Sequence, residues 1–124
     1  MAKRNIVLEH PERFAAPHPI APEKIDAAIE KALDKIEANI KAWGNGFVGT
    51  YTTGFRYPIG ENDNWVCGMH TGLYLLAWEL SGKEIFRDAA LAQLETYKKR
   101  FDEKIELSDH DVGFVYTPSC VAAW

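Results

Sequence analysis

The sequence has little of what marks proteins that bind nucleic acids, membranes or metals. It holds two cysteines, Cys67 and Cys120, in 124 residues, and their separation does not fit a metal-ligand pair. It has no block of basic residues and a formal net charge of −4, whereas nucleic acids require a positive surface. No apolar run approaches the roughly 20 residues that cross a bilayer. We therefore expect no nucleic-acid, membrane, metal or cofactor partner.

The start of the chain has too few apolar residues for a secretory signal peptide. Only Ile6, Val7 and Leu8 follow the charged residues Lys3 and Arg4, whereas a signal peptide needs about 7 to 15. We therefore expect a cytoplasmic protein whose two thiols are reduced and buried.

Length and composition indicate one small domain that follows an N-terminal arm. Residues 1–21 contain Pro11, Pro17 and Pro19, which do not continue a helix. This segment is predicted to be either an extended arm on the surface or a disordered one. Residues 22–124 form the domain, and a hydrophobic content of 47% allows it a core.

Helical periodicity dominates the domain and predicts an all-α fold. Residues 22–43 begin with a proline, carry an apolar stripe and end before Gly44. Residues 65–80 are apolar nearly all round, which predicts burial on more than one side. A tight turn at Gly82 joins them to a helix at 84–104, so the two form an αα-hairpin. The apolar stripe of the latter helix is Phe86, Ala90, Leu94, Tyr97 and Phe101.

A fourth helix is predicted to begin near Pro118, with Thr117 as its N-cap. The chain ends at Trp124, inside this apolar helix and without a C-cap or a charged last turn. We therefore expect the chain to be the N-terminal part of a longer protein. Such a part would leave apolar faces exposed on the second and fourth helices.

Residues 44–64 hold no helical period and form a long loop rich in glycine and aromatic residues. A loop of this length in a compact domain usually has a role. One of Asn62, Asp63 and Asn64 is expected to cap the helix that follows. Near the start of that helix, Gly68 and Gly72 would let a ligand or another backbone approach closely.

Two groups of residues are candidate sites. Asp109, His110 and Asp111 lie between the third and fourth helices. Beside an apolar wall, Asp111 could share or donate a proton, or both carboxylates could simply cap backbone groups of a turn. A metal site would need a second cluster of ligands. Trp65 and His70 lie at the start of the second helix, either as a stacking platform for a sugar or as core residues.

Two stretches, "NDNWVCGMHTGLYLLAWELSGKEIFRDAA" and "LSDHDVGFVYTPSCVAAW", make the chain resemble the unsaturated glucuronyl hydrolases, glycoside hydrolase family 88, over about residues 23–124. The resemblance implies an incomplete (α/α)6 barrel, or α/α-toroid, with about three and a half of its helices. It also implies a bacterial cytoplasmic enzyme that acts on lyase-generated glycosaminoglycan oligosaccharides. These enzymes hydrate the C4=C5 double bond of a 4,5-unsaturated uronic acid, which is thereby released.

The resemblance also implies roles for four residues. Asp111, in the "HDVGF" stretch, matches an aspartate that supports an acid/base aspartate in a later motif. That motif would lie beyond Trp124, so the chain alone is expected to be inactive. For substrate binding, Trp65 matches the tryptophan that packs against the unsaturated sugar, and His110 matches the residue that orients Asp111. His70 replaces an aromatic residue near the pocket.

Two other interpretations stay open. The unsaturated rhamnogalacturonyl hydrolases of the related family 105 share the fold and the hydration chemistry but act on another saccharide. A helical-hairpin interaction module without catalysis would bind through the exterior of its helices and would be a stable monomer.

Overall fold

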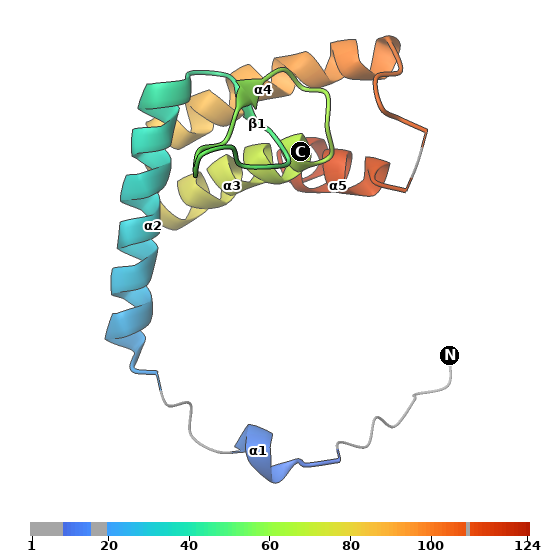
Figure 1. Ribbon diagram of the computed structural model, residues 1–124. Helices are drawn as coiled ribbons and strands as arrows, with labels where there is room; N and C mark the ends of the chain where they lie inside the picture. Colours follow the sequence, from blue (N-terminus) through green and yellow to red (C-terminus); the bar gives the residue numbers. More distant parts are fainter. Residues whose placement is uncertain (1–8, 16–19, 109) are drawn as a thin grey trace.

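The computed structural model describes residues 9–15, 20–108 and 110–124, and these are mostly helical (Figure 1). No helix in these ranges is both long enough and apolar enough to cross a membrane. The elements, in chain order, are α1 (Glu12–Ala15), α2 (Pro22–Trp43), β1 (Phe47–Val48), β2 (Ile59–Gly60), α3 (Val66–Ser81), α4 (Glu84–Asp102), α5 (Val112–Tyr116) and the π-helical turn η1 (Thr117–Val121).

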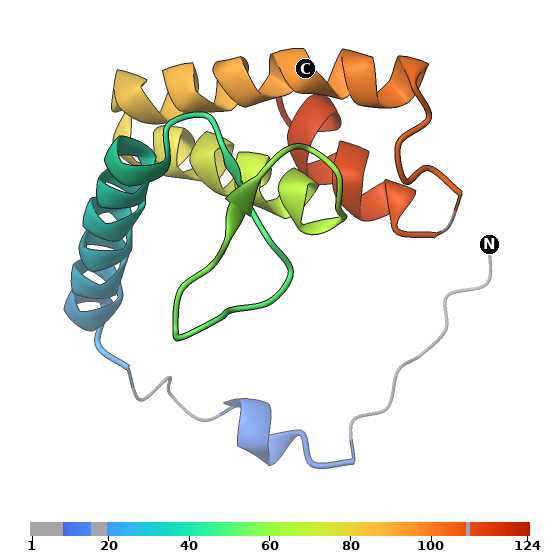
Figure 2. The ribbon, with the colours of Figure 1, turned by 45° about the horizontal axis from the view of Figure 1, so that its top comes forward.

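Helices α3 and α4 form the predicted antiparallel hairpin, and α5 with η1 packs on α3 (Figures 1 and 2). The hairpin turns at Gly82, which has a φ of 68° and donates its N–H to the Trp78 carbonyl at 2.7 Å. A left-handed residue at this position ends a helix most readily when it is glycine. The prediction of the hairpin and its turn is confirmed.

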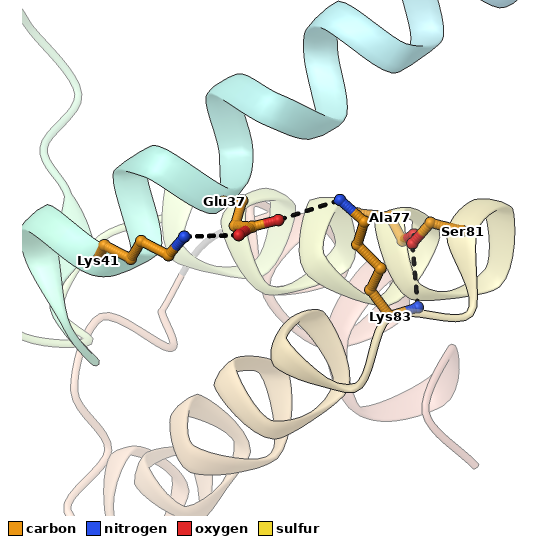
Figure 3. A network of polar contacts seen from close by, with 5 residues as sticks. All are labelled: Glu37, Lys41, Ala77, Ser81 and Lys83. Carbon is orange, nitrogen blue, oxygen red and sulfur yellow. Dashed lines mark hydrogen bonds and ion pairs between the residues drawn. The ribbon is translucent and has the colours of Figure 1, made fainter.

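A polar network ties this turn to α2, which crosses the hairpin at the same end (Figure 3). The Ser81 hydroxyl donates to the Ala77 carbonyl at 2.6 Å and accepts from the Lys83 N–H at 3.2 Å. The Lys83 ammonium donates to Glu37 on α2 at 3.1 Å, and Lys41 donates to the same carboxylate at 2.6 Å. Hydrogen bonds from Lys41 and Lys83 hold the pKa of Glu37 below its ordinary value.

The buried face of α4 differs from the predicted stripe at its C-terminal end. Tyr97 is buried as predicted, but Phe101 is 64% exposed and Arg100 is only 1% exposed. The buried positions continue from Gln93 through Tyr97 to Arg100 at spacings of four and three, which is one face of a helix. Phe101 lies one residue, about 100°, away from that face.

The predicted burial of the second helix on more than one side is wrong for one face of α3. Met69, Leu73, Leu76 and Leu80 are 40 to 55% exposed, and the first three line an open apolar groove together with Pro118 of η1. Cys67, Thr71, Tyr74 and Ala77 fill the opposite, buried face. In the fourth helix Phe114 and Val121 are also exposed. The expected apolar faces on the second and fourth helices are therefore present.

The fourth helix begins at Val112, not near Pro118 as predicted. Thr117 has helical dihedral angles (φ −66°, ψ −53°) and so is not an N-cap. Pro118 has no N–H to donate to the carbonyl four residues before it. The helix passes this position by widening to a π-helical turn, in which the Ala122 N–H bonds the Thr117 carbonyl at 3.2 Å. The Ser119 hydroxyl donates to the Val115 carbonyl.

The long loop between α2 and α3 carries a short antiparallel ladder that periodicity did not predict. Phe47 pairs with Gly60, and Val48 pairs with Ile59. Phe47 is buried, so the ladder anchors the loop against α3.

Two smaller expectations also need correction. In the N-terminal arm, Glu12–Ala15 is one helical turn rather than extended, while residues 1–8 and 16–19 lie outside the described residues. Both thiols are free, but only Cys67 is buried, since Cys120 is partly exposed. Cys120 packs against a buried cluster of Phe47, Cys67, Tyr97 and Val115, to which β1, α3, α4 and α5 each contribute one residue.

Candidate functional site

Two glycines set how closely the fourth helix approaches α3. A Cβ on Gly68 would lie 2.1 Å from the Phe114 carbonyl oxygen, and one on Gly72 would lie 2.7 Å from the Pro118 carbonyl oxygen. Such distances are far inside van der Waals contact, so only glycine allows this packing. Because Gly68 faces Phe114 and Gly72 faces Pro118, the two helices run in the same direction. Their N-termini, which hold Trp65 and Asp111, therefore lie at one end of the molecule.

Asp111 stands at the N-cap position of α5. Its carbonyl accepts the Phe114 N–H at 2.8 Å and the Val115 N–H at 3.1 Å, but its side chain makes no capping hydrogen bond. The Asp111 carboxylate therefore does not cap α5 itself. The alternative that the two aspartates cap other backbone groups of the turn stays a prediction. His110 Nε2 lies 3.2 Å from Asp111 Oδ1, and the two side chains are 89% and 30% exposed. Asp109, the third member of the candidate cluster, lies outside the described residues.

A small polar cavity of about 170 Å³ connects Asp111 to the start of α3. It holds carboxylates, a guanidinium and an indole ring next to one another, a combination that can bind a polar group and an apolar ring face. Its lining is Asp63, Asn64, Trp65, Arg100, Glu106, Asp111 and Val115.

Trp65 is held at the mouth of this cavity by the start of the helix. The Asn64 side-chain oxygen accepts the Val66 N–H at 2.9 Å, so the predicted cap among residues 62–64 is Asn64. The Trp65 ring centroid lies 6.0 Å from that of Phe114 on α5. The side chain remains 44% exposed, which leaves part of the indole available for stacking.

Trp65 also lines a second, larger cavity of about 460 Å³. This cavity lies between α2, the loop after β1 and α3, and aromatic rings form much of its wall. Rings in such a wall suit the apolar faces of a sugar. The aromatic residues of the lining, with histidine included, are Trp43, Tyr57, Trp65, His70 and Tyr74.

His70 is a buried member of that wall, with 6% of its surface exposed. Its ring packs 4.6 Å from Tyr74 and 6.0 Å from Trp43, centroid to centroid. Gln93 Nε2 lies 3.3 Å from His70 Nδ1. Burial lowers the pKa of His70 to about 4, so the ring is neutral at pH 7 and Nδ1 can accept the Gln93 amide proton.

A buried polar network supports this wall from below. Thr71 Oγ1 bonds the Gln93 side-chain oxygen at 2.9 Å and the Tyr97 hydroxyl at 2.8 Å. Gln93 Nε2 also donates to the Gly46 carbonyl at 3.1 Å, which fixes the loop to α4. Burial raises the pKa of Tyr97, which keeps its hydroxyl protonated.

Sequence reasoning did not find Arg100, Asn62 or Gln93, the buried polar residues around the two cavities. For the two residues of α4 the sequence does contain an indication, since Gln93 and Arg100 fall on the same helical face as the buried Tyr97. A polar residue on an otherwise apolar face indicates a buried network. Asn62 offered no such signal because it lies in a loop without a period.

Metal binding has no support in the ranges that the structure describes. There, no group of three or more His, Cys, Asp and Glu side chains lies close enough to hold a metal ion.

No family model matches this chain. An unsaturated chondroitin disaccharide hydrolase from Streptococcus pneumoniae is 33% identical over 117 residues, which are 94% of this chain and 30% of that protein. An unsaturated glucuronyl hydrolase from Bacillus sp. is 31% identical over 97 residues, or 78% of this chain and 26% of that protein.

The structural comparison agrees. The crystal structure of unsaturated glucuronyl hydrolase from Streptococcus agalactiae superposes on 97% of this chain with a TM-score of 0.83 and 31% identity. The chain is a homologue of the unsaturated glucuronyl hydrolases. It spans about 30% of the length of these relatives, and its helices form part of their α/α-toroid fold. A mutant of the Streptococcus agalactiae unsaturated glucuronyl hydrolase has been crystallised with dGlcA-GalNAc6S.

Proposed function

We propose that this chain supplies part of the active site of an unsaturated glucuronyl hydrolase. The substrate is a disaccharide or oligosaccharide, produced from a glycosaminoglycan by a lyase, that carries a 4,5-unsaturated uronic acid. One observation carries the proposal: Trp65 and Asp111 line one cavity in a chain homologous to such enzymes over 94% of its length.

The reaction consumes one water molecule. A proton adds to C4, and the water oxygen bonds to C5 after losing a proton. The hemiketal formed at C5 opens by breaking the bond from C5 to the ring oxygen, which leaves a ketone at C5 and a hemiacetal hydroxyl at C1. The hemiacetal then collapses: C1 becomes an aldehyde, its bond to the leaving sugar oxygen breaks, and that oxygen takes up a proton. Positive charge develops at C5 when C4 is protonated, so a carboxylate placed nearby lowers the barrier.

Asp111 is the residue to which we assign this stabilising role. Its 30% exposed carboxylate is open to the cavity, and His110 lies 3.2 Å away to orient it. Trp65 would pack against the ring of the unsaturated sugar, since its indole is partly exposed beside Asp111. His70 would bound the larger cavity as a neutral ring. The residue that delivers the proton is, by family resemblance, a second aspartate outside this chain.

We extend the proposal to the architecture of the active protein. Residues 22–124 would be the first part of a complete toroid of the length of its relatives. The exposed apolar face of α3 supports this, because further helices would cover it. Location in the bacterial cytoplasm stays a prediction.

The test is the substitution Asp111→Asn in the complete product of the gene that encodes this chain. Loss of the ultraviolet absorbance of the double bond reports turnover of an unsaturated chondroitin disaccharide. We expect turnover to fall by about 100-fold or more, because a stabilising group for transition-state charge is removed.

Asp102→Asn is the matched control, because Asp102 is an exposed carboxylate that pairs with Lys98 on the surface of α4. It should leave turnover unchanged. Full activity in a folded Asp111→Asn variant would refute the assignment. If the protein turns over an unsaturated rhamnogalacturonan disaccharide and not the chondroitin disaccharide, its activity is that of an unsaturated rhamnogalacturonyl hydrolase.

A further inference from the structure

Arg100 is a buried cation at the site end of α4. It is 1% exposed, although its neighbours Lys98 and Lys99 in the same turn are exposed. A buried guanidinium is stable only if its donors find acceptors, since removing it from water is costly. The hydrogen-bond acceptors of the Arg100 guanidinium therefore identify the segments that this side chain links.

The guanidinium bridges two segments that are distant in sequence. Nη1 donates to the Asn62 side-chain oxygen at 2.8 Å and to the Asn64 carbonyl at 2.7 Å. Nε donates to the Ile105 carbonyl at 3.1 Å, and Nη2 lies 3.5 Å from the Glu106 carbonyl. The first pair belongs to the loop that enters α3, and the second pair belongs to the segment that leads to α5.

These two segments carry the two residues on which the proposed function rests. Asn64 directly precedes Trp65, and Glu106 lies five residues before Asp111. Arg100 itself lines the small cavity that Trp65 and Asp111 share. One side chain thus fixes the backbone on both sides of that cavity.

Asn62 extends this connection into the helix. It is 6% exposed, and its Nδ2 donates to Thr96 Oγ1 at 2.8 Å, while Thr96 Oγ1 donates to the Gln93 carbonyl at 2.7 Å. Asn62 is therefore hydrogen-bonded to two residues of α4, Thr96 and Arg100.

We propose that Arg100 is a positioning residue, which fixes the indole of Trp65 relative to the carboxylate of Asp111 by bridging the loops that carry them. The inference rests on the proposed function. It also explains why arginine stands here rather than lysine. A planar fork with five N–H donors reaches acceptors on both sides, whereas a lysine ammonium is one point of donation.

The test compares Arg100→Lys with Lys99→Met in the complete gene product. Lys99 lies in the same turn and is exposed, so its replacement should change nothing. In Arg100→Lys we expect kcat for the unsaturated chondroitin disaccharide to fall by about 10- to 100-fold, as misplaced reacting groups do. The expected fall in kcat exceeds any rise in KM, because the reacting geometry is lost rather than the contact surface.

A double-mutant cycle separates positioning from a general loss of structure. If Arg100 acts through Trp65, the losses caused by Arg100→Lys and Trp65→Phe do not multiply in the double variant. Independent, multiplying losses would overturn the inference, as would a folded Arg100→Lys variant with wild-type kcat.

Hydrogen exchange makes the test independent of the proposed function. If the wild-type protein hydrates neither saccharide, the proposed function is refuted. The positioning role of Arg100 is then tested by hydrogen exchange alone. Arg100→Lys should speed exchange at residues 62–66 and 105–112 and leave the turn at 81–83 unchanged. Exchange that is unaltered, or that rises evenly over α3 and α4, would overturn the positioning role.

Discussion

The stability of the protein should fall with pH because of one buried histidine, His70. Burial lowers the pKa of its imidazole from the ordinary 6.5 to about 4. Between these values the unfolded chain binds a proton at this position and the folded chain does not. Stability from this group is therefore complete above pH 6.5 and is lost progressively as the pH falls towards 4.

The size of the effect follows from the two pKa values. One pKa unit corresponds to about 1.4 kcal/mol, so the full loss from His70 is about 3 kcal/mol. Between pH 7 and pH 5 the same linkage gives a loss of about 2 kcal/mol in the free energy of unfolding. This window lies above the range in which Glu37 titrates, because the pKa of that carboxyl lies below 4.5.

His70→Phe is the decisive variant, measured by urea unfolding of the complete gene product at pH 7, 6 and 5. Phenylalanine preserves the ring packing against Trp43 and Tyr74 but does not titrate. It leaves one Gln93 N–H without its acceptor, which costs about 1 to 3 kcal/mol at every pH. The variant should thus be less stable at pH 7 and lack about 2 kcal/mol of the wild-type loss between pH 7 and pH 5.

A surface histidine provides the control for His70→Phe. His10→Gln replaces a surface histidine whose side chain is 61% exposed and should keep the wild-type slope. Parallel stability curves for the wild type and His70→Phe would refute the reasoning. A titration of His70 near 6.5 in the folded protein, observed by NMR, would refute it as well.

Two further substitutions test the packing and the polar network. Gly68→Ala should destabilise the protein by about 1 to 2 kcal/mol in thermal or urea unfolding. Overpacking against the Phe114 carbonyl costs about 2 to 3 kcal/mol at this short distance, and the roughly 1 kcal/mol that alanine adds to a helix offsets part of it. Gly113→Ala is its control, since a Cβ there meets nothing within 4 Å and should be neutral or stabilising; equal effects at both positions would contradict the close approach. Glu37→Gln should reduce the acid-induced loss of stability below pH 4.5 by the share that Glu37 contributes, because the contribution of its lowered carboxyl pKa is present above that value and lost below it. Unchanged acid melts in Glu37→Gln would show that the ion pairs of Figure 3 contribute nothing.

Local patterns in the sequence were enough to predict most of the helical elements. The start of α2 at Pro22, its end before Gly44 and the turn at Gly82 follow from single-residue conformational preferences. The fourth helix did not follow, because Pro118 is equally suited to a helix start and to a π-helical turn. The tertiary structure distinguishes these two cases, because the Ala122 N–H donates to the Thr117 carbonyl and Pro118 therefore lies inside the π-helical turn.

Some residues of the candidate site could likewise be predicted from the sequence, and others could not. Trp65 and Asp111 could be selected by resemblance, and Gly68 could be expected to admit a close neighbour. The residues that hold the site together could not be selected, because their bonds join distant positions. In the run Lys98-Lys99-Arg100, Arg100 looks like a surface cation. Only the tertiary structure shows that Asn62 and Asn64 accept hydrogen bonds from it.

The bonds of Arg100 also set an order of events during protein synthesis. Asn62 and its guanidinium partner are 38 residues apart in the chain. At a translation speed of about 5 to 20 residues per second, the ribosome makes Arg100 about 2 to 8 s after Asn62. Throughout that interval Asn62 and Asn64, in the loop before α3, lack the hydrogen bonds from the Arg100 guanidinium. The site end of the hairpin is thus completed only once residue 100 has been made, and a chain arrested before residue 100 would present an open loop to chaperones and proteases.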